Sequence, residues 1–156
     1  MTTQSEYKNE PNADIKRLKI EGENFYCISN YDEMRPFFMS IVSDSHHWMF
    51  ISSNGALTAG RKNSEKALFP YYTADKITES SDTTGSKSIF QIHQDGETKV
   101  WEPFSERNTG RYSTTRNLYK NAIGNKIIFE EINHNFELTF RYDWNSSNLY
   151  GFVRKS

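Results

Sequence analysis

The feature that most constrains the fold is the stretch from His46 to Gly60, HHWMFISSNGALTAG, in which two apolar runs flank an Asn-Gly pair. Asn54-Gly55 predicts a type I′ hairpin turn, because that turn needs positive φ at both central residues and these two residue types tolerate it. The run before the turn, Trp48 to Ile51, is apolar at every position, so both sides of the strand are apolar. Such a strand is typical of a layered β structure that covers both of its faces.

The rest of the chain repeats this pattern of short apolar runs separated by turn residues. Phe136 to Trp144 alternates apolar and polar residues over its whole length, as expected of a strand with one buried face, and Asp95-Gly96 predicts a second hairpin turn. The 11 Phe, 9 Tyr and 3 Trp also favour strands over helices. We expect an all-β fold, an antiparallel β-sandwich, with strands near Ile15–Ile20, Phe25–Ser29, Phe37–Val42, His46–Gly60, Ser88–His93, Thr98–Trp101, Arg111–Tyr119, Lys126–Ile132, Phe136–Trp144 and Gly151–Ser156.

The length of 156 residues predicts one domain. Residues 1–14 are polar and without periodicity, so we expect a frayed or disordered leader, followed by a single sandwich domain over residues 15–156. Asn63-Ser64-Glu65 is expected to start one short helical turn, and Ser80–Ser88 to form a mobile surface loop. The sequence closes on a strand rather than a tail, so we expect the natural protein to continue.

Charge and hydropathy limit the possible partners and the location. With 19 basic and 20 acidic residues, the chain offers no electrostatic reason to bind nucleic acid or an anionic membrane. No apolar segment approaches the roughly 18–20 residues of a membrane span, and the N-terminus lacks a signal sequence. We therefore expect a cytoplasmic protein.

Metal and thiol chemistry find little support in the sequence. The single cysteine, Cys27, lies in an apolar run and is interpreted as a buried, inert thiol. His46-His47 follow Asp44 closely, but on a strand only His46 and Asp44 share a face, and a zinc site needs three or four ligands. We expect neither a metal nor a cofactor.

Acid pairs for glycoside hydrolysis are also not evident. Glu130 and Glu131 are adjacent on a strand and should point to opposite faces. Glu102 and Glu106 flank a turn that contains proline, with nothing else to define a site. No nucleophile elbow or phosphate-binding loop is present. The sequence therefore assigns no catalytic residue, and this chain alone is not expected to be an enzyme.

The best candidates for a ligand contact are aromatic and polar residues that follow the first hairpin. Aromatic faces stack on the C–H faces of sugars, while charged and amide groups reach the hydroxyls. The competing interpretation, which the usual packing role of large aromatics favours, is that these rings close the end of the sandwich. The candidate saccharide-binding residues are Arg61, Asn63, Tyr71, Tyr72, Asp75 and Trp101.

The order of these motifs is similar to the opening part of a known domain. The series runs from Ser52-Ser53-Asn54-Gly55 through Leu68-Phe69-Pro70-Tyr71-Tyr72 and Val100-Trp101-Glu102-Pro103 to the amphipathic strand pair at the end. Over about residues 30–156 it resembles the N-terminal β-supersandwich domain, galactose mutarotase-like, of cellobiose and chitobiose phosphorylases and related enzymes. In that family the sandwich precedes an (α/α)6 barrel that holds the catalytic acid and the phosphate site.

The resemblance implies a non-catalytic domain of a carbohydrate-active enzyme, a glycoside phosphorylase or hydrolase, which helps to shape a saccharide site or a subunit interface. No matched position is the catalytic acid of the family. A downstream helical-barrel domain of the same polypeptide would be its partner, and homo-oligomerisation stays open. Two alternatives remain: a freestanding carbohydrate-binding module, or a small β-barrel that carries an apolar ligand, which the two-sided strands fit less well.

Overall fold

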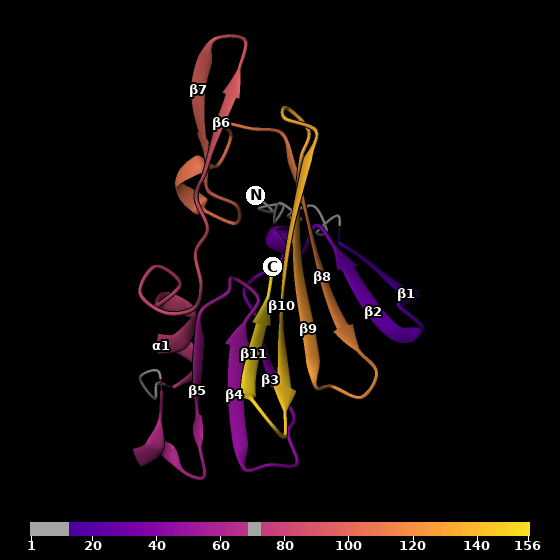
Figure 1. Ribbon diagram of the computed structural model, residues 1–156, viewed down its shortest axis with the longest axis vertical. Helices are drawn as coiled ribbons and strands as arrows, with labels where there is room; N and C mark the ends of the chain where they lie inside the picture. The colour runs from indigo at the N-terminus through magenta and orange to yellow at the C-terminus, as the bar shows by residue number, and fades with distance from the viewer. Residues whose placement is uncertain (1–12, 69–72) are drawn as a thin grey trace, which may run out of the picture.

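The computed structural model describes residues 13–68 and 73–156. Within these ranges the fold is all-β, with antiparallel sheets packed against each other and little helix (Figure 1). The strands are β1 Asp14–Ile20, β2 Glu23–Ser29, β3 Phe38–Ile41, β4 His47–Ser52, β5 Leu57–Arg61, β6 Phe90–Gln94, β7 Glu97–Trp101, β8 Thr114–Asn121, β9 Lys126–Asn133, β10 Leu138–Ser147 and β11 Gly151–Lys155. The helices are the α-helix α1 Ala74–Glu79 and the 3-10 helices η1 Tyr31–Glu33, η2 Ser64–Lys66 and η3 Glu106–Asn108.

Six antiparallel strands form the larger sheet, in the order β1-β2-β8-β9-β10-β11. The register places Leu118, Phe129 and Tyr142 side by side on one face, which we call the inner face. The alternation expected for Phe136–Trp144 is confirmed in the second half of that range, where Tyr142 and Trp144 of β10 are buried and Arg141 on the other face is exposed. It is wrong for the first half, because Phe136 lies in the turn before β10 and Leu138 is exposed.

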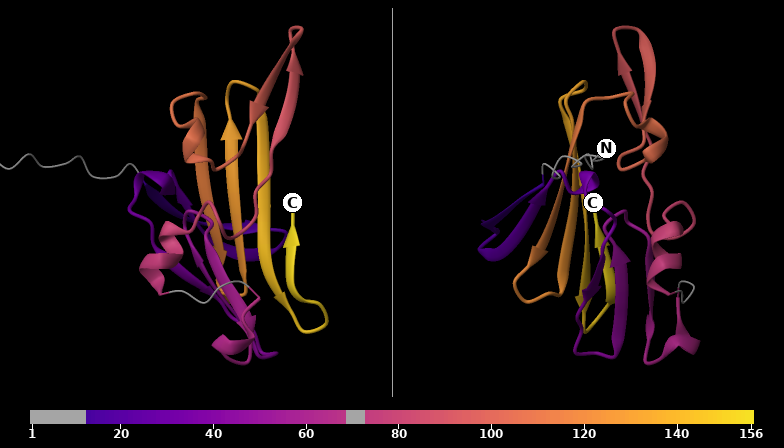
Figure 2. Two further views of the ribbon diagram at one scale, coloured as in Figure 1. Left: turned by 90° about the vertical axis from the view of Figure 1, so that its left-hand side faces the viewer. Right: turned by 180° about the vertical axis from the view of Figure 1, so that it is seen from behind.

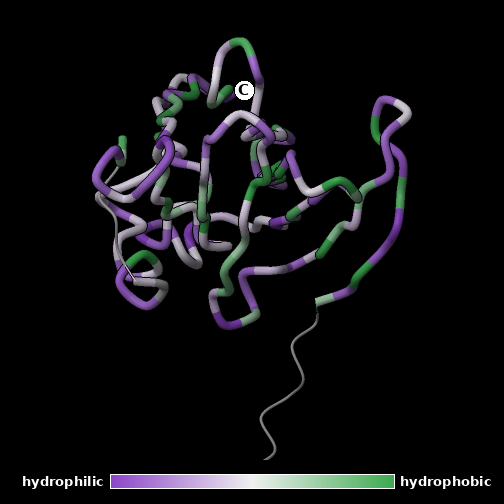
Figure 3. Tube along the Cα trace, turned by 90° about the horizontal axis from the view of Figure 1, so that it is seen from below, coloured by the Kyte–Doolittle hydropathy of each residue, from purple (hydrophilic) through white to green (hydrophobic). Residues whose placement is uncertain are grey.

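The smaller sheet, β3-β4-β5, lies across the inner face of the larger one and closes the sandwich (Figure 2). Apolar and polar stretches alternate along the strands in Figure 3, as expected when one face of each strand enters the core. Burial of the apolar side chains between the two sheets is the main source of stability. The core residues are Tyr31, Ile41, Met49, Ile51, Leu57, Ala59, Leu118, Ile127, Phe129, Tyr142 and Trp144.

The β4–β5 hairpin is confirmed, but its turn differs from the type I′ turn expected for Asn54-Gly55. Only Gly55 has positive φ, at 88°, and four residues separate the two strands. The Asn54 side chain instead donates from Nδ2 to the Thr78 carbonyl oxygen at 2.8 Å, and its Oδ1 accepts from the Ala56 amide at 3.3 Å. The conformation of Asn54 thus depends on a contact with α1, and the residue types of the turn alone cannot predict that contact.

The third sheet is the β6–β7 hairpin, which extends past the end of the larger sheet (Figure 1). Its turn is of the expected kind, because Asp95 and Gly96 have φ of 54° and 78°. At its base Phe90 packs on Phe140 of β10, with the ring centroids 5.1 Å apart. The hairpin and η3 thus cover the upper part of the inner face, above the smaller sheet.

Three shorter segments differ in part from what the sequence predicts. The expected helical turn after Asn63 is present as η2, whereas α1 was not expected. The loop Ser80–Ser88 is partly anchored, because Thr84 is buried and its Oγ1 accepts from the Leu57 amide at 3.1 Å. The first strand begins at Asp14, inside the expected leader, and residues 1–12 lie outside the described part of the chain.

Candidate functional site

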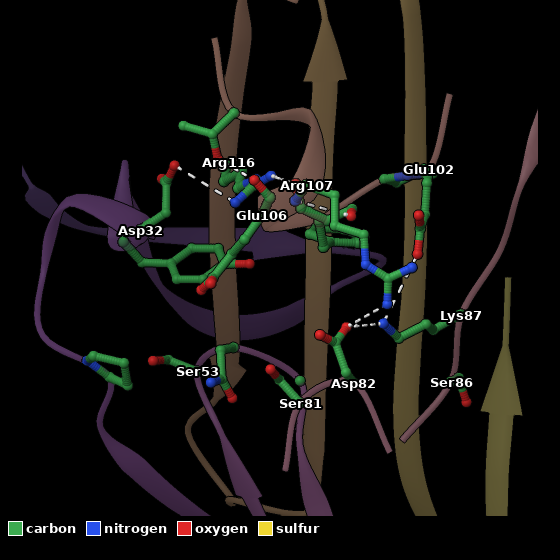
Figure 4. Close-up of a pocket in the computed structure, with 18 of the residues that line it drawn as sticks. Asp32, Ser53, Ser81, Asp82, Ser86, Lys87, Glu102, Glu106, Arg107 and Arg116 are labelled. Atoms are coloured by element: carbon green, nitrogen blue, oxygen red, sulfur yellow. Dashed lines mark hydrogen bonds and ion pairs between the residues drawn. The ribbon is translucent and has the colours of Figure 1, made fainter. Parts of the chain in front are cut away.

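A cleft of about 460 Å³ opens on the inner face of the larger sheet, between the β4–β5 turn and η3 (Figure 4). Its walls come from η1, the β4–β5 turn, the α1–β6 loop and the segment between β7 and β8, and its floor from β8 and β10. We call it the central cleft. The charged and aromatic residues that line it are Tyr31, Asp32, Asp82, Lys87, Glu102, Phe104, Glu106, Arg107, Arg116 and Tyr142.

Aromatic rings form the apolar part of the central cleft. Phe104 and Tyr142 meet edge to face with centroids 5.4 Å apart, and Tyr142 stacks on Phe129 at 4.9 Å. Tyr31 and Tyr142 are each only 4% exposed. Burial raises the pKa of both phenols, so the two tyrosine rings stay uncharged over the physiological range.

A buried ion pair holds the wall of the cleft in place. Glu131 of β9 accepts from Arg116 Nε at 2.8 Å and from the Phe104 amide at 2.6 Å, both at Oε2, and from Trp101 Nε1 at 2.8 Å at Oε1. Arg116 also donates from Nη2 to the Ser105 carbonyl oxygen at 3.2 Å. One carboxylate thus fixes the β7–β8 segment over the sheet and leaves the outer part of Arg116 at the cleft.

Ion pairs between exposed groups cross the rim of the cleft (Figure 4). Asp82 of the α1–β6 loop pairs with Lys87 and, at 3.2 Å, with Arg107 of η3. Lys87 also lies 3.8 Å from Glu102. The hydrogen bond from Lys87, followed by the charges of Lys87 and Arg107, holds the pKa of Asp82 below its usual range. These contacts join the α1–β6 loop to the β7–β8 segment across the opening.

The charges in the central cleft are largely paired. Each of the three cations contacts a carboxylate: Lys87 and Arg107 contact Asp82, and Arg116 contacts Glu131. The described residues that line the cleft include four carboxylates and three cations. Within the described ranges, Glu106 has no cationic partner. The cleft therefore offers hydrogen-bonding groups and aromatic surface but no surplus positive charge.

The structure places the sequence-predicted site residues apart from this cleft. Arg61, Asn63 and Asp75 are exposed, at the end of β5, before η2 and in α1, and none of them lines the central cleft. A hydrogen bond from the Thr73 side chain lowers the pKa of Asp75. Tyr71 and Tyr72 lie outside the described residues.

Trp101 is only 3% exposed. Its indole is held by Glu131, and its ring packs on Phe90 with centroids 5.5 Å apart. Trp101 thus holds the start of the β7–β8 segment against β9. It is not among the residues that line the central cleft.

Sequence reasoning missed most of the cleft. The pair Glu102 and Glu106 had been noted only as flanking a turn, and both line it. No sequence pattern near Asp82 or Arg107 indicates a site, because the two residues lie in different loops and are 25 residues apart in the chain. The expected opposite orientation of the adjacent Glu130 and Glu131 is confirmed by their different partners on the two faces.

Other chemistry receives no support from the described part of the chain. No group of three or more His, Cys, Asp or Glu residues could hold a metal ion there. His47 instead contacts Ser45 Oγ through Nδ1 at 2.9 Å and packs edge-on against Phe152. None of the described helices is both long and apolar enough to cross a membrane.

The chain was compared with known families and with curated proteins. No family model matches it, and no curated protein matches it either.

Proposed function

We propose that this chain is a non-catalytic β-sandwich domain of a carbohydrate-active enzyme, of the disaccharide phosphorylase or glycoside hydrolase kind, and that it binds a saccharide in the central cleft. The supporting observation is that aromatic rings and paired polar groups line the same cleft. Its volume lies within the roughly 300–1,000 Å³ of small-ligand sites, which combine apolar walls with a few placed polar groups.

A non-catalytic role is supported by two carboxylates, Asp82 at the rim of the cleft and Glu131 beneath it. A glycosidase needs a general acid with a raised pKa and a second carboxylate across the bond to be cleaved. Asp82 has a lowered pKa because of Lys87 and Arg107, so it is poorly suited to donate a proton. Glu131 is fully occupied by three donors beneath the cleft.

The charge pattern supports a neutral saccharide. A phosphate or carboxylate group in the cleft would meet carboxylates such as Asp32 and Glu106 and would have to displace an existing partner of each cation. Hydroxyl groups can donate to and accept from the same side chains without breaking those pairs. Repulsion of anions therefore favours uncharged sugars.

A freestanding carbohydrate-binding module is the second candidate. A cleft that is lined by aromatic rings and polar groups would serve equally in such a module. The coding sequence that follows Ser156 distinguishes the two candidates. Sequence typical of an (α/α)6 barrel would support the enzyme domain, and an immediate stop codon would contradict it.

Calorimetric titration of the chain with neutral β-linked glucosyl and N-acetylglucosaminyl disaccharides tests the cleft itself. We expect saturable binding that Arg107→Ala and Glu106→Gln weaken by at least about tenfold, the loss expected for one hydrogen bond to a charged group. Glu79→Gln, an exposed acid on α1, is the control and should leave the affinity unchanged. Flat titrations with every sugar would overturn the proposal.

A further inference from the structure

A second hollow lies between the β6–β7 hairpin and the β9–β10 turn, beyond η3 from the central cleft. Its volume is about 510 Å³, and we call it the distal groove. Its lining includes Glu97, Lys99, Arg111, Tyr112, Asn135 and Phe136. These residues come from three separate segments, none of which was singled out as a ligand contact by the sequence.

Two aromatic rings form a fixed surface in the distal groove. Tyr112 and Phe136 have centroids 4.8 Å apart, and both are only half-buried. The hydroxyl of Tyr112 donates to the Val100 carbonyl oxygen at 2.9 Å, which fixes that ring against β7. The Phe136 amide donates to Asn133 Oδ1 at 3.2 Å, which fixes the turn that carries the second ring.

The two segments that carry these rings are also joined to each other. The Ser113 amide donates to Asn135 Oδ1 at 2.7 Å, and the His134 amide donates to the Ser113 carbonyl oxygen at 2.9 Å. The aromatic surface is therefore organised before any ligand arrives. Such preorganisation lowers the entropy that binding must overcome.

The cations of the distal groove are less occupied than those of the central cleft. Within the described ranges Arg111 has no carboxylate partner, and its guanidinium lies 5.5 Å from the centre of the Tyr112 ring. Lys99 has only a long contact with Glu97, at 4.0 Å. The groove thus combines aromatic surface with donors that are free to reach sugar hydroxyls.

A small hollow beside η3 shares lining residues with both sites. It measures about 80 Å³ and shares Asp32 and Arg116 with the central cleft and Tyr112 with the distal groove. At about 30 Å³ for each water molecule, it can hold a few waters. The cleft, this hollow and the groove thus follow one another along the β7–β8 segment.

We propose that the distal groove is a second saccharide subsite, which receives the outer sugar units of an oligosaccharide whose end lies in the central cleft. This inference rests on the proposed function, because it assumes that the cleft binds the first units. Phe136 supplies the stacking surface, and Arg111 and Asn135 supply hydrogen bonds to hydroxyl groups. The preferred ligand is accordingly an oligosaccharide rather than a disaccharide.

The test is calorimetric titration of the whole chain with neutral gluco-oligosaccharides of increasing length. Their glycosidic linkage is that of the disaccharide that binds most tightly. We expect the longer ligands to bind about three- to tenfold more tightly than the disaccharide, the effect of one aromatic contact. Phe136→Ala and Arg111→Gln should remove this gain and leave disaccharide affinity unchanged. Tyr150→Ala, at an exposed ring in the β10–β11 turn, is the matched control and should keep the gain.

The outcomes separate the two proposals. Arg111→Gln changes an exposed side chain, so it keeps the test valid if Phe136→Ala unfolds, which a thermal melt would detect. Equal gains in the wild type and both variants would overturn the distal subsite and leave the proposed function intact. If the affinity of the wild type does not depend on ligand length, the distal subsite is also overturned and the proposed function stands. Failure to bind any saccharide would overturn both the distal subsite and the proposed function.

Discussion

Trp101 Nε1 donates a hydrogen bond to Glu131 Oε1 at 2.8 Å, and both side chains are buried, 3% and 2% exposed. The opposite oxygen of the same carboxylate accepts from Arg116 and from the Phe104 amide. The Glu131 carboxylate thus pairs with the charge of Arg116, accepts hydrogen bonds from the Trp101 indole and from one backbone amide, and holds the β7–β8 segment in position. The wall of the central cleft therefore depends on Glu131.

Glu131→Ala is expected to lower the free energy of unfolding by about 3–5 kcal/mol, because it leaves Arg116 with only a long contact to Asp32, at 3.9 Å, and leaves the Trp101 indole and the Phe104 amide without their acceptor. Urea denaturation measures this loss. The control is Glu79→Ala on the exposed face of α1, expected to change stability by no more than about 0.5 kcal/mol. A loss below about 1 kcal/mol for Glu131→Ala would contradict the assigned role.

Trp101→Phe tests the indole by itself. The ring that packs on Phe90 is largely kept, whereas the hydrogen bond to Glu131 is lost, so we expect a destabilisation of about 1–3 kcal/mol. Tyr150→Phe, which changes an exposed ring, should have no effect beyond about 0.5 kcal/mol. If Trp101→Phe weakened saccharide binding without altering stability, Trp101 would be a ligand contact, as its sequence context suggested.

The strands could be predicted from the sequence because their periodicity is local. The alternation in β10 indicates which side chains enter the core, and the apolar run in β4 indicates a strand without indicating which of its faces enters the core. The short helix α1 could not be predicted, since six residues are too few to show a helical period. Asn54 also differs from expectation, because its side chain bonds to Thr78 of that unpredicted helix.

The central cleft could not be predicted for a different reason. Asp32, Asp82, Arg107 and Arg116 lie in four segments, and each residue in isolation is an ordinary charged side chain. Only the packing of the sheets brings the segments together. Five of the six residues predicted to bind saccharide lie close together in the sequence, between Arg61 and Asp75, whereas the cleft is assembled from loops that are distant in the sequence.

The outer face of the larger sheet predicts a pH dependence of stability. Burial acts to raise the pKa of Glu130, but hydrogen bonds from Asn117, Tyr119 and Arg141 outweigh it and lower the pKa below the ordinary 4.5. The folded state thus binds this proton less readily than the unfolded state. The contribution of Glu130 is present above pH 4.5 and is lost as the pH falls from there through the folded-state pKa.

Urea denaturation of the wild type and Glu130→Gln between about pH 3 and pH 7 measures this contribution. The difference in unfolding free energy should be constant near neutral pH and should shrink in acid. Asp143→Asn is an informative control of opposite sign, because burial raises the pKa of Asp143. Its advantage over the wild type should grow as the pH rises through the folded-state pKa of Asp143. A difference for Glu130→Gln that is equal at every pH would contradict the argument.

The paired charges of the central cleft lead to an expectation about ligand charge. A sugar phosphate or a uronic acid should bind at least about tenfold more weakly than the neutral sugar of the same ring, because Asp32 and Glu106 repel it and the cations are engaged. Competition titrations measure this ratio. The ratio should decrease at 1 M salt, where the Debye length is only about 3 Å. Tighter binding of the anionic sugar would contradict the charge argument.

Gly85 of the α1–β6 loop lies against Gly55 of the β4–β5 turn. A Cβ atom there would lie 2.4 Å from the Gly55 carbonyl oxygen, and the φ of Gly85 is +83°. Gly85→Ala must therefore strain the backbone and also push apart two walls of the central cleft. Gly96→Ala is a matched control, because Gly96 has a similar φ of +78° but no atom within 4 Å of the added carbon.

We expect Gly96→Ala to cost about 1–2 kcal/mol from its backbone conformation alone. Gly85→Ala should cost about 1–3 kcal/mol more, the usual penalty for forcing extra volume into a packed site. Saccharide binding should weaken in Gly85→Ala and stay unchanged in Gly96→Ala, when both are measured well below their melting temperatures. Equal stability losses in the two variants would mean that the loop yields freely, and the α1–β6 loop would then not be a fixed wall of the cleft.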